Sequence, residues 1–132
     1  VPFGQVHSVE RDGDAVALIK KNREKFAADN LTVYHGDAVE QIAGLPVPDR
    51  VFIGGSGGKL DEILALIAGF DRKIRVCIAA VTLETIAEAG EILGRYDETY
   101  DVIQATIGRG RKIGSYHIMD TNNPVMLFTA EI

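Results

Sequence analysis

The chain has 132 residues, a length that fits one domain and leaves no room for two independent cores. Its composition, 46% hydrophobic and 25% charged, excludes intrinsic disorder. The net charge of −5 argues against a broad surface for nucleic acid or for an anionic membrane.

No apolar stretch approaches the roughly 18 residues that cross a membrane, and no signal peptide is apparent. We therefore expect no membrane partner. The single cysteine, Cys77, lies in an apolar run and is expected to be buried and inert. One cysteine excludes a disulfide framework, so we expect a protein of the reducing cytoplasm.

Strands and helices alternate along the first two thirds of the chain. Strands are predicted at residues 5–10, 32–37, 49–55 and 74–81, and helices at residues 14–28, 38–45, 61–68 and 83–93. Asp12 or Asp14 is expected to cap the first helix, and Thr82 the fourth. The fourth strand is apolar on both faces, which is typical of a central parallel strand.

The alternation stops after residue 93. Residues 100–108 and 125–130 are predicted as two strands joined by the polar segment 109–123, with no helix between them. Four successive strand–helix units indicate an α/β fold with a mostly parallel, doubly wound, Rossmann-like sheet and helices on both faces. The last two strands predict an antiparallel hairpin that closes one edge.

Two acids stand at the ends of the first two predicted strands. Ligands of open α/β sheets bind beyond the carboxyl ends of the strands, so these positions are candidates for a site. Glu10 can accept two hydrogen bonds from the ribose hydroxyls of a nucleotide. Asp37, followed by the small Ala38, can accept a hydrogen bond from an adenine amino group. The alternative for both acids is a cap of the following helix.

Residues 54–58 (GGSGG) follow the third predicted strand. Backbone without side chains lets a ligand approach closely, and free amides ahead of a helix can bind a carboxylate. The spacing differs from that of a phosphate-binding P-loop. The alternative is a turn that only connects the strand to the following helix.

His7, His35 and His117 are scattered and show no metal-ligand spacing, so no metal site is predicted.

Four stretches carry a resemblance over essentially the whole chain: residues 52–58 (FIGGSGG), 81–85 (VTLET), 109–111 (RGR) and 123–125 (NPV). With the strand-end acids, they resemble the class I S-adenosylmethionine-dependent methyltransferases. More narrowly, they resemble the precorrin-6B C(15)-methyltransferase (decarboxylating) family of cobalamin biosynthesis, whose activity is in many bacteria the C-terminal domain of precorrin-6Y C(5,15)-methyltransferase.

The resemblance implies S-adenosylmethionine as cofactor. Glu10 would hold its ribose, Asp37 and Ala38 would flank its adenine, and Gly54 and Gly55 would lie near the transferred methyl. It assigns no catalytic residue, because methyl transfer of this kind depends mainly on positioning. The family's glycine-rich first motif and first strand are not found. We therefore expect one methyltransferase domain over residues 1–132 that is incomplete at its N-terminus, with a gap in the sheet between the strands ending at Glu10 and Gly54.

The implied substrate is a tetrapyrrole, precorrin-6B or its cobalt form, methylated at C-15 with decarboxylation of the ring C acetate. A flat substrate edged with carboxylates needs an apolar floor and a cationic rim. The candidates for contacts to it are Ser56, Thr82, Arg109 and Arg111, with Lys59 and Lys112 as further cations. The alternative for the basic run at 109–112 is a solvated loop or an interface patch. The family also implies a homotetramer.

Two other functions stay open on the sequence. One is a class I methyltransferase for another substrate, such as RNA or a small molecule. The other is a cofactor-less remnant that serves as an assembly module. The net charge of −5 weighs against nucleic acid, as does the glycine run in place of the Asn/Asp-Pro-Pro-Tyr-like motif of many such enzymes.

Overall fold

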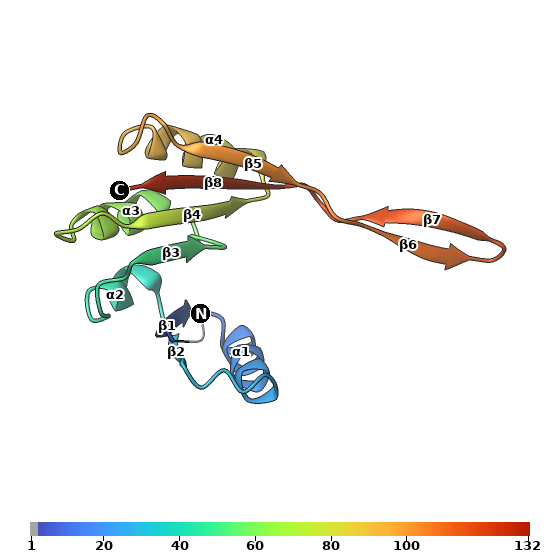
Figure 1. Cartoon of the computed structure of the whole chain (residues 1–132), viewed down its shortest axis with the longest axis horizontal. Coiled ribbons are helices and arrows are strands. Elements are labelled where there is room, and N and C mark those ends of the chain that lie inside the picture. Colours follow the sequence, from blue (N-terminus) through green and yellow to red (C-terminus); the bar gives the residue numbers. More distant parts are fainter. Residues whose placement is uncertain (1–2) are drawn as a thin grey trace. The chain divides into compact units, whose positions relative to one another are not determined.

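The structure, a computed structural model, describes residues 3–132 (Figure 1). The chain forms two compact units, Val1–Val47 and Pro48–Ile132. Its strands form three sheets: β1-β2 in the first unit, and β3-β4-β8-β5 and β6-β7 in the second. Strands β1 and β3 thus belong to different sheets, which agrees with the interruption expected between the strands ending at Glu10 and Gly54.

The first unit consists of two strand–helix pairs. These are β1 (Val6–Glu10), α1 (Gly13–Lys25), β2 (Leu31–His35) and α2 (Ala38–Ile42). Strands β1 and β2 are parallel, with Glu10 opposite His35. Asp12 caps α1, its carboxylate accepting a hydrogen bond from the Ala15 amide at 2.8 Å. The helix ends three residues before the predicted end because Ala27 adopts a left-handed conformation, with φ 48°.

The second unit contains the four-stranded sheet and two helices. Its elements are β3 (Arg50–Ile53), α3 (Leu60–Ala68), β4 (Arg75–Ala80), α4 (Leu83–Leu93), β5 (Asp101–Ala105) and β8 (Val125–Glu131). Strands β3 and β4 are parallel, and β8 inserts antiparallel between β4 and β5. The predicted antiparallel pair is therefore confirmed, with β5 at the edge of the sheet.

The core of the second unit lies on one face of its sheet. Along β4, Val76, Ile78 and Ala80 are buried, whereas the residues between them are only partly covered. Helices α3 and α4 contact each other, and both bury apolar side chains. Both helices of the second unit therefore share the core on this face of its sheet. Cys77, on the other face, is half-buried and not fully buried as expected.

Gly90 of α4 lies against two aromatic side chains. A side chain there would start 3.4 Å from the Tyr100 hydroxyl and 3.8 Å from the Phe128 ring. Those two rings form a tilted pair with centroids 6.1 Å apart. Both distances are ordinary van der Waals contacts, so the packing of α4 on these rings leaves room for a methyl group at this position.

The turn between α4 and β5 is fixed by one carboxylate. Asp97 accepts hydrogen bonds from the hydroxyl and amide of Thr99, at 2.7 and 2.8 Å, and from the Glu131 amide at 3.3 Å. The bonds from Thr99, with the weaker one from Glu131, hold the pKa of Asp97 below its usual value. The turn is thereby tied to the end of β8.

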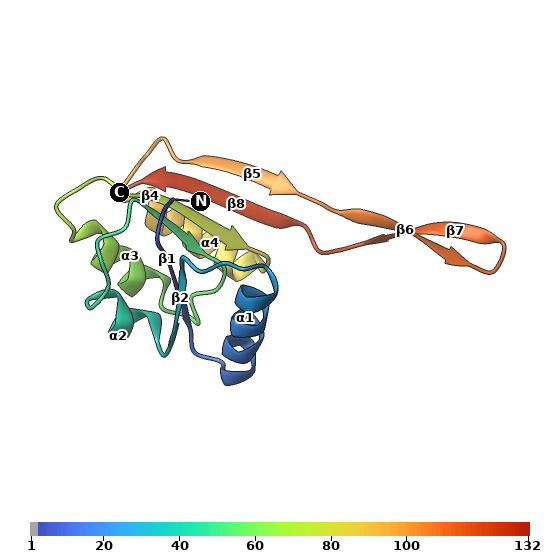
Figure 2. The same ribbon diagram turned by 60° about the horizontal axis from the view of Figure 1, so that its bottom comes forward.

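The polar segment that joins the last two predicted strands consists mainly of two further strands, so the alternative of a solvated loop for residues 109–112 is wrong. It forms β6 (Gly108–Ile113) and β7 (Tyr116–Thr121), an antiparallel pair joined by a two-residue turn in which Gly114 has φ 59°. We call β6, β7 and this turn the hairpin arm. The arm extends from the ends of β5 and β8 and pairs only with itself (Figures 1 and 2). Every residue of β6 and β7 is exposed.

No helix within residues 3–132 is long and apolar enough to span a bilayer.

Candidate functional site

In the first unit, the two strand-end acids lie at the same edge of a parallel pair. The Gly36 amide donates to the Glu10 carbonyl at 2.9 Å, which continues the β1–β2 ladder to the residue before Asp37. Glu10 is thus the last residue of β1 and Asp37 lies two residues after β2, at the ends of adjacent strands, as the sequence predicts. This is the edge at which ligands of α/β sheets bind.

Glu10 is half-buried and keeps one carboxylate oxygen available. Its Oε1 accepts a hydrogen bond from the Asp12 amide at 2.9 Å, so the side chain orders the turn that precedes α1. Asp12, and not Glu10, caps that helix. Within residues 3–132 the other oxygen, Oε2, makes no hydrogen bond, and it can accept one from a ribose hydroxyl.

Asp37 caps α2. Its Oδ1 accepts a hydrogen bond from the Val39 amide at 3.0 Å, which satisfies one of the free amides of the helix N-terminus. The alternative interpretation of Asp37 as a cap is therefore confirmed. The cap orients the carboxylate and leaves the small Ala38 beside it, so the structural role is compatible with an adenine contact.

In the second unit, residues 54–58 form the turn between β3 and α3. Gly57 and Gly58 adopt left-handed conformations, with φ 61° and 82°, so the turn interpretation of these two positions is confirmed. The strand-end positions differ from them. A side chain at Gly55 would meet no atom within 4 Å, and one at Gly54 would meet only the Phe52 ring at 3.4 Å. The backbone at Gly54 and Gly55 is open to a ligand.

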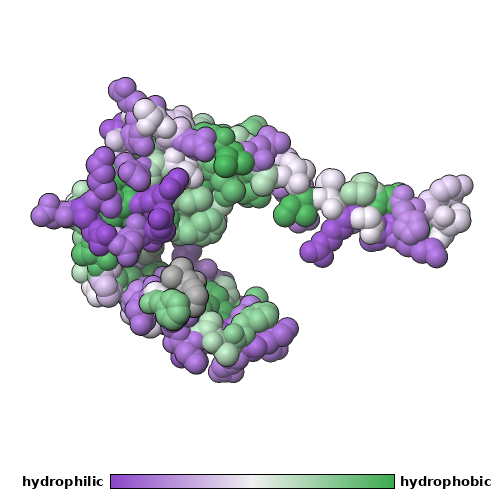
Figure 3. All heavy atoms as spheres, in the orientation of Figure 1, coloured by the Kyte–Doolittle hydropathy of each residue, from purple (hydrophilic) through white to green (hydrophobic). Residues whose placement is uncertain are grey.

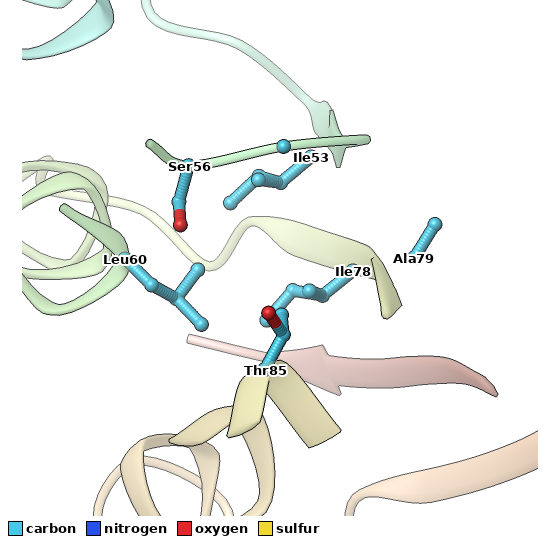
Figure 4. A pocket seen from close by; sticks show the side chains of 7 residues that line it. Ile53, Ser56, Leu60, Ile78, Ala79 and Thr85 are labelled. Atoms are coloured by element: carbon cyan, nitrogen blue, oxygen red, sulfur yellow. The ribbon is translucent and has the colours of Figure 1, made fainter. Parts of the chain in front are cut away.

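A small pocket lies between the ends of β3 and β4 (Figure 4). We call it the strand-end pocket; its lining residues are Ile53, Gly55, Ser56, Leu60, Ile78, Ala79 and Thr85. The side chains of Ile53, Leu60 and Ile78 form an apolar floor. The hydroxyls of Ser56 and Thr85 point into the pocket from opposite sides (Figure 4). Ser56 is among the residues that the sequence predicts for substrate contact, whereas Thr85 is not.

Thr82 does not line this pocket, but it is hydrogen-bonded to Thr85, which does. Thr82 caps α4, as predicted, and its hydroxyl oxygen accepts a hydrogen bond from the Thr85 amide at 3.2 Å. The two hydroxyl oxygens are 2.9 Å apart and hydrogen-bonded to each other. The three-residue spacing from a capping threonine was the signal for Thr85, because residues three apart on a helix lie on the same face.

Of the predicted rim cations, Lys59 lies at the start of α3, between the lining residues Ser56 and Leu60, whereas the other three are not next to the strand-end pocket. Arg109, Arg111 and Lys112 lie on β6 of the hairpin arm, which pairs only with β7. Arg111 forms an ion pair with Asp120 of β7 at 3.2 Å. Within the described residues, Arg109 has no such partner and is exposed. Of the two arginines, Arg109 is therefore the one that remains available to an anionic group.

Each of the two units offers groups that fit a part of S-adenosylmethionine. The first unit offers a carboxylate with an available oxygen at Glu10 and a small residue beside a second acid at Ala38. The second offers open glycine backbone at the end of β3. No group of three or more His, Cys, Asp or Glu side chains within residues 3–132 could hold a metal ion.

The element order defines the class of protein. Four strand–helix units followed by an antiparallel pair, whose last strand inserts beside β4, form the class I methyltransferase fold. The match to the family described as the precorrin methyltransferase domain covers residues 2–131. The chain belongs to this family.

Named relatives agree with the family. The chain is 38% identical to the probable cobalt-precorrin-6B C(15)-methyltransferase (decarboxylating) of Pyrobaculum calidifontis, over 96% of this chain and 65% of the relative. It superposes on precorrin-6Y C5,15-methyltransferase from Geobacter metallireducens with a TM-score of 0.89 and 33% identity, covering 98% and 69% of the two chains. It superposes on precorrin 8W decarboxylase from Methanobacterium thermoautotrophicum with a TM-score of 0.86 and 31% identity, covering 97% and 70%. The chain spans about 65% of the length of the first two curated relatives that it matches.

Proposed function

We propose that this chain is part of a cytoplasmic enzyme of cobalamin biosynthesis. The enzyme transfers a methyl group from S-adenosylmethionine to C-15 of precorrin-6B, or of its cobalt form, and decarboxylates the ring C acetate. The observation that carries the proposal is the 38% identity, over 96% of this chain, to a relative named for this reaction. The family match over residues 2–131 supports treating both compact units as parts of one methyltransferase domain.

In this proposal the strand ends hold the cofactor. Glu10 accepts a hydrogen bond from the ribose through Oε2, and Asp37 with Ala38 flanks the adenine. Gly54 and Gly55 lie along the methionine part, where any side chain would occupy open space at Gly55. S-adenosylmethionine supplies an electrophilic methyl on sulfur, and the chain's own contribution is to orient that group toward the substrate.

Apolar side chains at the end of β4 suit a flat, greasy substrate. Val81 and Leu83 follow β4 directly and remain 49% and 80% exposed. Large exposed apolar side chains beside a candidate site favour a ligand with apolar faces. We propose that they contact the macrocycle, and that Ser56 and Thr82 lie along the substrate site.

The function is tested with the full-length protein, precorrin-6B or its cobalt form, and S-adenosylmethionine labelled in the methyl group. We expect transfer of label to the tetrapyrrole together with release of CO2. Calorimetric titration with S-adenosylhomocysteine separates the alternatives. Binding without turnover of either tetrapyrrole favours a methyltransferase for another substrate, and an absence of binding favours the assembly module.

We further propose that the protein assembles as a homotetramer through the hairpin arm. An isolated two-stranded hairpin is at best marginally stable in water. The arm nevertheless exposes Tyr116 by 75% and Met119 by 68%, and Figure 3 shows apolar residues among the hydrophilic ones along it. A second copy would cover these side chains.

The mass of the full-length protein in light scattering should therefore be that of a tetramer. Substituting Ile118→Asp places a charge on the arm, where Ile118 is now 42% exposed, and should lower the mass. The matched control is Leu18→Asp, on α1 and 58% exposed, which should leave the mass unchanged. A monomeric mass of the unmodified protein contradicts this assembly.

Arg109 should contribute to substrate binding and not to cofactor binding. If it pairs with a carboxylate of the tetrapyrrole, Arg109→Ala should raise the apparent KM about 3- to 5-fold, as for a partly solvated ion pair. Arg109→Lys should restore little, because lysine lacks the planar fork of arginine. S-adenosylhomocysteine affinity should be unchanged. A silent Arg109→Ala variant contradicts the rim role, and a loss of mass before any change in KM assigns Arg109 to the subunit interface.

A further inference from the structure

The strand-end pocket is the place where polar groups from different elements converge on an apolar space. Ser56 belongs to the turn after β3, and Thr85 lies in the first turn of α4. Their hydroxyls face each other across a floor formed by Ile53, Leu60 and Ile78 (Figure 4). Both hydroxyl-bearing residues are half-buried, so a ligand group can reach them.

The hydrogen bonds already present leave both hydroxyls able to act on a ligand. Within residues 3–132 the Ser56 hydroxyl has no hydrogen-bond partner. The Thr85 hydroxyl is bonded to that of Thr82, and either oxygen can be the donor. When Thr82 donates, the Thr85 proton is available to a third group. A hydrogen-bonded chain from Thr82 through Thr85 then ends at the pocket.

These groups match one carboxylate oxygen in size and chemistry. The pocket is partly open to solvent, and its volume of about 10 Å³ corresponds to roughly one oxygen-sized group. A carboxylate oxygen accepts two hydrogen bonds, which Ser56 and Thr85 can both donate. No positively charged side chain lines the pocket, so its occupant is held by hydroxyls against an apolar wall.

We propose that the strand-end pocket binds the substrate carboxylate that leaves as CO2. This inference rests on the proposed function and assigns its decarboxylation to a place in the fold. The carbon–carbon bond to the carboxyl carbon breaks, and its electron pair passes into the conjugated macrocycle. CO2 leaves, and a proton from solvent completes the methyl group that remains on the ring.

Each part of the pocket has a separate effect on this step. The hydroxyls of Ser56 and Thr85 fix the direction of the carboxylate, so that the breaking bond stays aligned with the macrocycle. The apolar floor removes water from a charged group whose product, CO2, is neutral, which favours the loss of charge. Ser56 and Thr85 therefore position the leaving group and do not themselves exchange protons with the substrate.

The test compares Ser56→Ala and Thr85→Val with the unmodified full-length protein on precorrin-6B or its cobalt form. Methyl transfer and CO2 release are measured in the same reaction. Each variant should lower CO2 release about 2- to 10-fold relative to methyl transfer, the range expected for one lost hydrogen bond. Thr85→Ser should restore the ratio. The matched control is Thr32→Val, at an exposed position of β2, which should leave the ratio unchanged.

Affinity for S-adenosylhomocysteine should be unchanged in every variant, because the cofactor contact proposed at the end of β3 is made by the backbone of Gly54 and Gly55 and not by the two hydroxyls. Ser56→Ala does not touch the α4 cap, so it decides the outcome if Thr85→Val weakens folding. An unchanged or raised ratio of CO2 to methyl in Ser56→Ala overturns the inference and leaves the proposed function standing. If the unmodified protein turns over neither tetrapyrrole, the proposed function fails and the inference fails with it.

Discussion

Replacing Leu64 by alanine should lower the free energy of unfolding by about 2–5 kcal/mol. Leu64 lies on the face of α3 that is fully buried, with no exposed surface, and it is among the largest fully buried side chains of the second unit. Truncation removes its apolar contacts and leaves a cavity that close-packed neighbours fill only in part. Urea unfolding followed by far-ultraviolet circular dichroism measures the effect.

The matched control for this substitution is Leu83→Ala. Leu83 is the first residue of α4 and is 80% exposed, so its truncation should change the free energy of unfolding by no more than about 0.5 kcal/mol. Equal effects of the two substitutions would show that the side chain of Leu64 does not pack in the core of the second unit.

Strand ends and helix caps could be predicted because their signals are local. Asp12 and Thr82 both cap helices at predicted positions, and β8 pairs antiparallel with β5 as expected. Each cap depends on a few neighbouring residues, and the antiparallel pair follows from the absence of a helix between the last two strands. The positions of the strand-end acids could be predicted for the same reason, because the sequence pattern indicates both where a strand ends and where the next helix begins.

The hairpin arm could not be predicted from apolar periodicity. Strand β6 alternates glycine with arginine, and β7 mixes His117, Asp120 and apolar residues on exposed faces. A strand that buries neither face does not show the alternation by which strands are recognised. The two strands of the arm are recognised only by their pairing with each other, which runs from Gly108 opposite Thr121 to Ile113 opposite Tyr116.

The strand-end pocket was predicted only in part, because it depends on long-range pairing. Ser56 was identified from the glycine run, a local signal. Thr85 becomes relevant only when β3 lies beside β4, with Phe52 opposite Cys77 and Ile53 opposite Ile78. That register brings the turn after β3 beside the start of α4, so that the hydroxyls of Ser56 and Thr85 line the same pocket.

Replacing Glu10 by alanine should weaken binding of S-adenosylhomocysteine by about 1.5–3 kcal/mol, since bonds to a charged acceptor are lost. This corresponds to roughly 10- to 150-fold in Kd. The structure supports a large effect for two reasons. Oε2 makes no hydrogen bond within the described residues, and the bond from the Asp12 amide to Oε1, at 2.9 Å, holds the carboxylate in one orientation before the cofactor arrives.

Two further variants show whether the affinity depends on the carboxylate itself. Glu10→Gln keeps a carbonyl oxygen for the Asp12 amide but loses the charge, so its Kd should lie between those of the unmodified protein and Glu10→Ala. Glu40→Ala, at an exposed position of α2, removes a carboxylate from the same unit and should leave the Kd unchanged. Calorimetry on the full-length protein compares all of them. If Glu10→Ala binds S-adenosylhomocysteine as tightly as the unmodified protein, Glu10 only orders the turn before α1, and the ribose contact must come from another residue.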